Sequence, residues 1–198
     1  MVNPFEITNY HRTKEELEEF LLFCIVVAGK TAYIQANKLE QFLVSNQNKL
    51  NFKQKEPFNI LKVLYLNDQL LQEIKEAKLG QYTKIFNAFC YICNSNLDLV
   101  KCSIEELENI PGVGPKTSRF FMLHSRNCQH AILDTHILKF LKKYDENVPK
   151  STPSNKKIYK KYESLFLDIC RSVNKEPAEY DLELWKLYAK RNKNEIYE

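Results

Sequence analysis

The chain has 198 residues, 44% of them hydrophobic, which suffices for one domain or two small ones with a true core. Its 29 basic and 25 acidic residues leave a net charge of +4, which permits nucleic-acid binding without requiring it. Only four glycines and seven prolines are present. This scarcity of turn residues disfavours a β-sandwich or barrel and favours long helices.

No apolar run approaches the roughly 20 residues that a membrane span needs. The N-terminal segment has the pattern of neither a signal peptide nor a transit peptide. We therefore expect a cytoplasmic protein without membrane association, whose six cysteines are free thiols.

Helical periodicity runs through most of the chain, beginning with a capping box at Thr13 and Glu16. A second capping box, Ser103 and Glu106, begins a short helix that ends at Pro111, and Pro115 is suited to the first position of the next helix. The pattern predicts an all-α fold with helices at 13–28, 31–46, 57–65, 67–77, 81–94, 103–110, 115–125, 155–174 and 178–192, and another from residue 134. Residues 145–154 form the only loop-like linker.

Two of the four glycines, Gly112 and Gly114, lie in one short run between two predicted helices, Ile110-Pro-Gly-Val-Gly-Pro-Lys-Thr117. Helix, glycine turn and helix predict a helix–hairpin–helix at about residues 103–125. Glycine permits positive φ and the close approach of a phosphate to the backbone. We expect free N–H groups at Val113, Gly114 and the next helical turn, where the helix dipole attracts an anion. The pattern thus predicts a DNA-backbone clamp, and the alternative is a tight turn without a ligand.

Lys116 and Asp134 follow this hairpin, eighteen residues apart. Lys116 lies in a first helical turn, where the dipole disfavours a cation and favours the neutral amine that a nucleophilic lysine needs. Taken alone, it is more typical of a solvated surface lysine or a plain phosphate contact than of a nucleophile. Asp134 begins a helix and taken alone is typical of an N-cap. The pair at this spacing is what favours chemistry on a nucleotide.

Residues 110–117 and Leu133-Asp134-Thr135-His136 resemble the signature of the helix–hairpin–helix DNA glycosylases, which include endonuclease III, the adenine-mismatch glycosylase and 8-oxoguanine glycosylase. Residues 80–84 and 31–43 resemble further family segments, so the likeness covers roughly residues 15–145. The resemblance implies two interlocked helical subdomains, residues 1–29 plus 129–198 and residues 30–128, with DNA across the cleft between them.

The resemblance also implies a mechanism and a function. Lys116 would attack C1′ of a flipped nucleotide, expel the base, form a Schiff base and break the strand by β-elimination, while Asp134 stabilises positive charge on the sugar. We therefore predict a monomeric, bifunctional DNA glycosylase and AP lyase that excises an oxidised base from double-stranded chromosomal DNA. Alternatives are a monofunctional glycosylase for alkylated or mismatched bases, in which Asp134 activates water, and a non-catalytic DNA-binding protein.

One departure from endonuclease III concerns metals. That enzyme carries an iron–sulfur cluster on four cysteines, whereas only Cys170 lies beyond Asp134 here, so we expect no cluster. Cys90, Cys93 and Cys102 fit buried apolar thiols better than a metal site. A monovalent cation at the hairpin is compatible with this view, and no other cofactor is expected.

Further contacts are assigned as follows. The residues expected to touch DNA are Gly112, Val113, Gly114, Thr117, Lys139 and Lys30, and Arg119 is balanced between a DNA contact and another role. Asp181 and Trp185 are candidates for reading and stacking on the extruded base, although their spacing also fits a core-facing helical stripe. With the missing cluster, they slightly favour 8-oxoguanine over oxidised pyrimidines. The base preferred opposite the lesion is not indicated.

Overall fold

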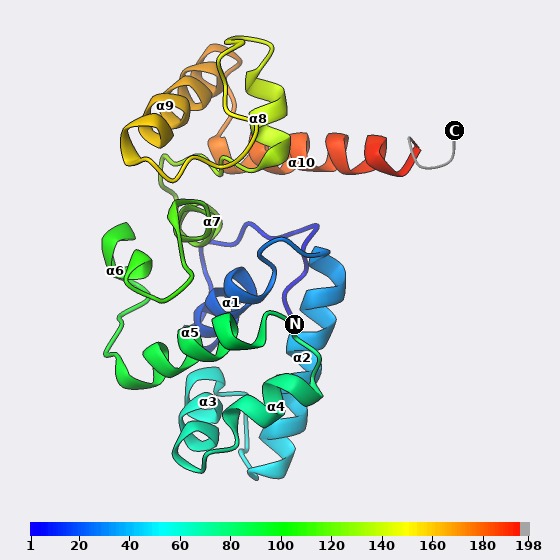
Figure 1. Cartoon of the computed structure of the whole chain (residues 1–198), viewed down its shortest axis with the longest axis vertical. Helices are drawn as coiled ribbons and strands as arrows, with labels where there is room; N and C mark the ends of the chain where they lie inside the picture. Colours follow the sequence, from blue (N-terminus) through cyan, green and yellow to red (C-terminus); the bar gives the residue numbers. More distant parts are fainter. Residues whose placement is uncertain (195–198) are drawn as a thin grey trace. The chain divides into compact units, whose positions relative to one another are not determined.

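The computed structural model describes residues 1–194, and all regular secondary structure in this range is helical (Figure 1). The helices are α1 (Lys14–Val26), α2 (Ala32–Lys49), α3 (Pro57–Leu66), α4 (Leu70–Glu76), α5 (Tyr82–Asn94), α6 (Ile104–Glu108), α7 (Pro115–Ser125), α8 (Thr135–Leu141), α9 (Lys156–Ser172) and α10 (Pro177–Asn194). The all-α prediction is confirmed. None of the described helices is both long and apolar enough to cross a membrane.

Local sequence signals fix several of these helix starts. The hydroxyl of Thr13 accepts from the Glu16 N–H at 3.3 Å, and the Glu16 carboxylate accepts from the Thr13 N–H at 2.8 Å. Ser103 and Glu106 form the same reciprocal pair at 3.1 and 2.8 Å. Both predicted capping boxes are therefore present, and each satisfies two backbone donors that a helix N-terminus leaves unpaired.

The chain forms two compact units, residues 1–113 and the part from residue 114 onward. In the first unit, α1 packs against α2, α3 and α5, and its residues 20–26 are all buried. Such a helix, apolar around most of its circumference, forms the centre of a core. The predicted grouping of residues 1–29 with residues 129–198 would join a part of the first unit to the second unit, and it stays a prediction.

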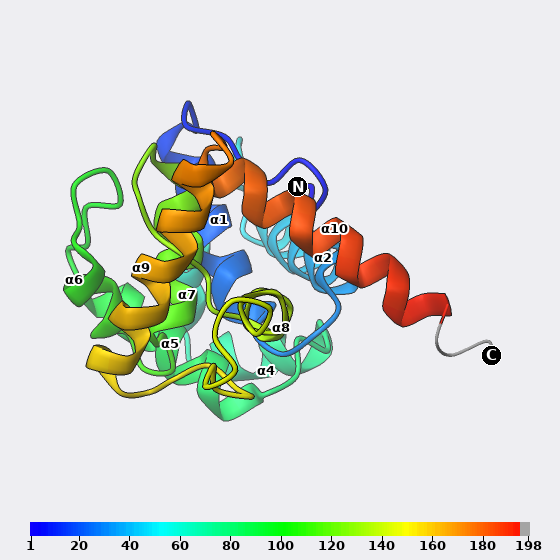
Figure 2. The ribbon, with the colours of Figure 1, turned by 90° about the horizontal axis from the view of Figure 1, so that it is seen from above.

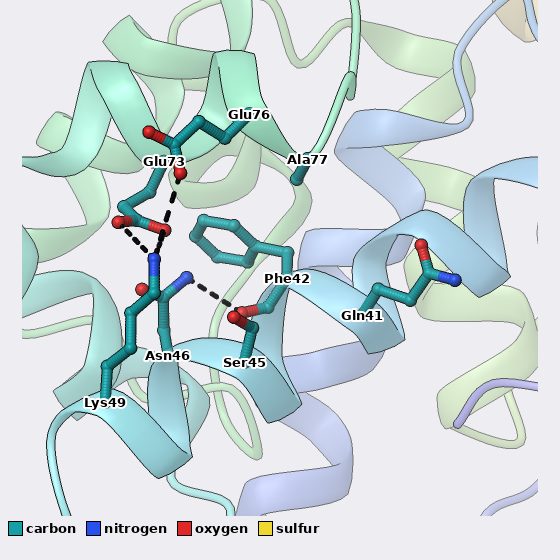
Figure 3. A pocket seen from close by; sticks show the side chains of 8 residues that line it. All are labelled: Gln41, Phe42, Ser45, Asn46, Lys49, Glu73, Glu76 and Ala77. Atoms are coloured by element: carbon teal, nitrogen blue, oxygen red, sulfur yellow. Dashed lines mark hydrogen bonds and ion pairs between the residues drawn. The ribbon is translucent and has the colours of Figure 1, made fainter.

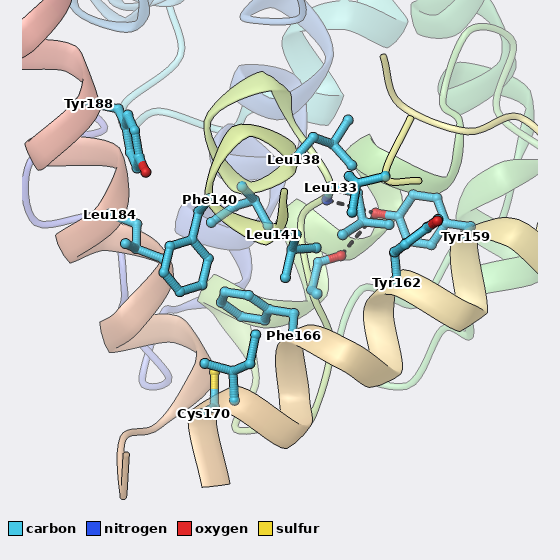
Figure 4. Close-up of a cluster of buried hydrophobic side chains, with 14 residues drawn as sticks. Leu133, Leu138, Phe140, Leu141, Tyr159, Tyr162, Phe166, Cys170, Leu184 and Tyr188 are labelled. Atoms are coloured by element: carbon cyan, nitrogen blue, oxygen red, sulfur yellow. Dashed lines mark hydrogen bonds between the residues drawn. The ribbon is translucent and has the colours of Figure 1, made fainter. Parts of the chain in front are cut away.

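The second unit has its own core, formed by α8, α9 and α10, which Figure 2 shows side by side. Phe140 of α8 and Phe166 of α9 both contact the ring of Tyr180 of α10, with ring centroids 5.6 and 6.1 Å apart. Figure 4 shows this cluster of buried side chains. Full burial of one such apolar side chain stabilises a fold by about 1.5–3 kcal/mol. This core supports the helices that carry the candidate site.

Candidate active site

The hairpin turn ends the first unit, and Gly112 has a backbone conformation that favours glycine, with φ +81°. The side chain of Lys84, on α5, lies over the same residue. A Cβ at Gly112 would lie 2.6 Å from Cε and 2.8 Å from Cγ of Lys84. Two features therefore favour glycine at this position, the positive φ and the close approach of Lys84. Only the first could be predicted from the sequence.

One expected donor of the clamp is already in use. The Val113 N–H donates to the Ile110 carbonyl at 2.9 Å, so the expectation that it is free for a phosphate is wrong. The turn closes on itself at that point. Gly114 is extended, and a Cβ added to it would meet nothing within 4 Å. The backbone at Gly114 and the first turn of α7 therefore carry what remains of the predicted clamp.

Asp134 is the N-cap of α8. Its Oδ1 accepts from the N–H groups of His136 and Ile137, at 2.8 and 2.9 Å. The capping alternative is thus confirmed for this one oxygen, while Oδ2 makes neither bond. Capping and chemistry can therefore use different oxygens of the same carboxylate.

Asp181 lies close to both Lys116 and Asp134, and all three belong to the second unit. Burial raises the pKa of the Asp181 carboxyl, contact with His124 opposes that rise, the charge of Asp134 adds to it and that of Lys116 reduces it. Charges influence the pKa of a carboxyl group in this way only when they lie in its neighbourhood. The structure therefore brings together three of the predicted residues, from α7, α8 and α10.

His124 is the residue that sequence reasoning missed. Its Nε2 lies 3.4 Å from Oδ2 of Asp181, its side chain is 1% exposed, and the Phe120 ring packs against its edge at 5.3 Å. A sequence signal did exist. Lys116, Phe120 and His124 follow at four-residue intervals along α7 and so share one face of the helix.

Trp185 is four residues beyond Asp181 on α10 and is only partly buried. Leu184 and Tyr188, by contrast, belong to the core of the second unit. The predicted core-facing stripe therefore holds for these two residues, and Trp185 lies at its border. Its role against an extruded base stays a prediction.

The predicted DNA contacts differ in their surroundings. Lys139 is exposed, with Nζ 5.9 Å from the Tyr188 ring centre. The Thr117 side chain is buried, so a DNA contact there would use its backbone N–H. In the first unit, the Lys30 amine donates to the carbonyls of Val26 and Leu79 at 3.1 and 2.7 Å. Burial lowers the pKa of Lys30, and the charges of Lys84 and Lys38 lower it further.

Arg119 is bound within the protein. Its Nε donates to Glu163 at 2.8 Å, and its guanidinium lies 4.4 Å from the ring centre of Tyr159. Only 15% of the side chain is exposed. Of the two roles considered for Arg119, these contacts favour the structural one.

Of the predicted buried thiols, Cys102 is buried, whereas Cys90 and Cys93 are only partly buried. Burial raises the pKa of Cys93 to about 11 and that of Cys170 to about 12. Such thiols stay protonated at neutral pH, and the thiolate is the form that binds metals. No group of three or more histidine, cysteine and acidic residues suited to a metal occurs among the described residues. The expectation of no cluster stays a prediction.

A polar hollow in the first unit is lined by residues of α2, α4 and the turn after α4 (Figure 3). Its lining residues are Gln41, Phe42, Ser45, Asn46, Lys49, Glu73, Glu76 and Ala77. The Lys49 amine pairs with both carboxylate oxygens of Glu73, at 2.7 and 2.9 Å. None of the predicted site residues lines this hollow, so it is separate from the candidate active site.

Known structures share this fold. The 8-oxoguanine DNA glycosylase of Methanocaldococcus jannaschii has a TM-score of 0.61 at 22% identity, covering 92% of this chain and 83% of that one. The M. jannaschii 8-oxoguanine glycosylase/lyase bound to 15-mer DNA containing 8-oxoguanine has a TM-score of 0.62 at 21% identity, covering 94% and 87%. The corresponding glycosylase of Thermotoga maritima has a TM-score of 0.60 at 22% identity, covering 88% and 80%.

Sequence comparison identifies the family. An 8-oxoguanine DNA glycosylase/AP lyase of Thermoplasma volcanium is 29% identical over 179 residues, which is 88% of this chain and 80% of that protein. Another protein of that name, from Picrophilus torridus, is 32% identical over 84 residues, or 40% and 37% of the two chains. The sequence model of the helix–hairpin–helix 8-oxoguanine DNA glycosylases matches residues 1–175. This chain therefore belongs to the 8-oxoguanine DNA glycosylase family.

Proposed function

We propose that this protein is a bifunctional glycosylase and AP lyase, which removes 8-oxoguanine from double-stranded DNA and then cuts the strand. The proximity of Lys116, Asp134 and Asp181 in one unit carries this proposal. An amine at a helix N-terminus beside two carboxylates has the parts of a covalent mechanism on a sugar. Family membership and the names of the relatives support the same substrate.

The reaction begins with the uncharged Nζ of Lys116. It forms a bond to C1′ while the bond from C1′ to the base breaks, and the electron pair leaves with the base, which takes up a proton. One proton of the bonded amine then passes to the ring oxygen O4′ as the C1′–O4′ bond breaks, and the nitrogen electron pair forms the double bond of a protonated Schiff base. Loss of a proton from C2′ expels the 3′ phosphate by β-elimination. Asp134 stabilises the positive charge that develops on the sugar.

The target base must leave the DNA stack to reach Lys116. In this proposal Asp181 reads the edge of the extruded base and Trp185 stacks on it. The contact with His124 holds the Asp181 carboxylate in place. DNA is held without reading its sequence by the backbone at Gly114 and α7, with help from Lys139 and Lys30.

The wider setting belongs to the same proposal. The protein acts as a monomer on chromosomal DNA in the cytoplasm, without membrane association or an iron–sulfur cluster, and a monovalent cation at the hairpin is compatible with it. The modest net charge of +4 suits transient, non-specific contact with DNA.

Borohydride trapping tests the mechanism. Duplexes carrying 8-oxoguanine, an oxidised thymine or an abasic site are incubated with wild type, Lys116→Gln and a control, Lys142→Gln, in which an exposed lysine changes in the same way. We expect trapped protein in wild type and Lys142→Gln, strongest with 8-oxoguanine, and none in Lys116→Gln. Free base without trapping would indicate a monofunctional enzyme. Neither product on any duplex would indicate a binding role alone.

A further inference from the structure

The segment 131–134 ends at Asp134, and its buried backbone groups form hydrogen bonds with side chains. It runs between α7 and α8 outside any helix, and Ala131 and Leu133 are fully buried. Buried N–H and C=O groups need partners, and here no neighbouring strand supplies them. The partners are side chains instead.

Three side chains satisfy all four backbone groups of Ala131 and Leu133. The Tyr159 hydroxyl donates to the Ala131 carbonyl at 2.9 Å and accepts from the Leu133 N–H at 3.1 Å. Glu163 accepts from the Ala131 N–H at 3.2 Å, and the Thr152 hydroxyl donates to the Leu133 carbonyl at 2.7 Å. Figure 4 shows Tyr159 reaching this segment from α9. The residue before Asp134 is thus held at both of its backbone groups.

The same α9 side chains also hold α7. Arg119, three residues after Lys116, donates to Glu163 and lies over the Tyr159 ring. Tyr159 is 1% exposed and Glu163 8% exposed, so these contacts are shielded from water. One pair of residues on α9 therefore touches both elements that carry the proposed catalytic groups.

We propose that Tyr159, Glu163 and Thr152 are positioning residues for the reaction, which hold segment 131–134 and, through Arg119, fix Asp134 relative to Lys116. They act through other residues and do not touch the reacting atoms. This inference rests on the proposed function, since it assigns a role in the same reaction.

The protonation states fit this role. Burial raises the pKa of the Tyr159 hydroxyl, so it keeps the proton that it donates to Ala131. Burial also raises the pKa of Glu163, but hydrogen bonds from His130 and Arg119 outweigh it, and the net pKa lies below its ordinary value. Glu163 therefore stays ionised at neutral pH. A misplacement of about 1 Å at a reacting group can cost about a hundredfold in rate.

Tyr159→Phe tests the inference, with Tyr162→Phe as a matched control. Tyr162 is a buried tyrosine on the same helix, whose hydroxyl donates to the Asn147 carbonyl at 2.9 Å and not to segment 131–134. Four quantities are measured on a duplex with 8-oxoguanine: Tm, the Kd for DNA, the single-turnover rate of base release and the rate of borohydride trapping. We expect both variants to lower Tm, and Tyr159→Phe to lower it more, because two buried backbone groups then lose their partner. Only Tyr159→Phe should slow base release and trapping, by about ten- to a hundredfold, with the Kd within about twofold of wild type.

Thr152→Val keeps the test open if Tyr159→Phe does not fold, because Thr152 is not part of the core. It removes the donor to Leu133, and we expect base release to slow by about three- to tenfold at unchanged Kd. Equal rate losses in Tyr159→Phe and Tyr162→Phe, or wild-type rates in Tyr159→Phe and Thr152→Val, would overturn the inference alone. Wild-type protein that releases no base would overturn the proposed function, and the inference with it.

Discussion

At the scale of single residues, Asp134 shows why a structural role does not exclude a chemical one. The two N–H groups at the start of α8 both bind Oδ1, which fixes the carboxylate in one orientation. A catalytic group held by its own helix cap needs no further ordering when substrate arrives. The N-cap hydrogen bonds therefore contribute to positioning as well as to helix stability.

Two substitutions separate these roles of Asp134. Asparagine caps a helix about as well as aspartate, so Asp134→Asn should leave the free energy of unfolding within about 0.5 kcal/mol of wild type. It removes the negative charge, and we expect base release to slow by about 10²–10⁴-fold. Asp134→Ala should slow the reaction similarly and also lose about 1 kcal/mol of stability. Denaturant unfolding and single-turnover assays measure both effects. A fully active Asp134→Asn would show that capping is the only role of this residue.

At the scale of elements, the hairpin divides its two glycines between different tasks. Gly112 has positive φ and lies against the Lys84 side chain, whereas Gly114 is extended and its Cβ position is open. The first glycine is needed by the fold itself. The second is needed only if something outside the protein approaches the backbone.

Alanine at each glycine tests this division. Gly112→Ala forces a side chain into a left-handed conformation and displaces Lys84, so we expect a loss of about 1–2 kcal/mol of stability. Gly114→Ala should leave Tm unchanged, but its methyl group would occupy the path of a phosphate. We expect it to weaken DNA binding about tenfold, or about 1.4 kcal/mol. Thermal unfolding and DNA titration give the two values. Unchanged DNA affinity in Gly114→Ala would argue against a phosphate contact at this point.

The helices were predictable because their signals are local. Capping boxes, prolines in first turns and apolar periodicity predicted the start of α7 at Pro115 and placed the other helices within a few residues. The catalytic pair Lys116 and Asp134 was proposed from spacing and family resemblance, and its roles stay a prediction. Both kinds of signal are written in short stretches of sequence.

The supports of the site were not predictable in this way. Arg119 and Glu163 are 44 residues apart, and Tyr159 lies 28 residues from Ala131. No periodicity relates such positions, because the contacts depend on how α9 packs in the finished fold. The contact between His124 and Asp181 is missed for the same reason.

At the scale of the whole molecule, a buried charge in the candidate site lowers the free energy of unfolding. Burial raises the pKa of Asp181, so the charged form of this carboxyl is less favourable in the folded protein than in the unfolded chain. Glu163 has the opposite effect, because its pKa is lowered by its partners. Its contribution to stability is present above the ordinary pKa of glutamate and is lost as the pH falls.

Asp181→Asn should therefore raise the stability of the protein and lower its rate of base release. Asparagine can still accept a hydrogen bond from His124 but carries no charge, so we expect Tm at pH 7 to rise by about 2–4 °C, or about 1 kcal/mol for a chain of this length. The gain should shrink as the pH falls through the raised pKa of Asp181 towards the ordinary aspartate value of about 3.9, because the wild-type carboxyl then takes up a proton and no longer buries a charge.

Base release by Asp181→Asn should slow by at least about tenfold if Asp181 reads the extruded base. Glu183→Gln, which makes the same charge change at an exposed site on α10, should show no such gain in Tm and wild-type activity. Once Asp181 is protonated, wild type and Asp181→Asn no longer differ in charge at this position. A Tm gain in Asp181→Asn that persists at low pH would therefore show that its cause is packing.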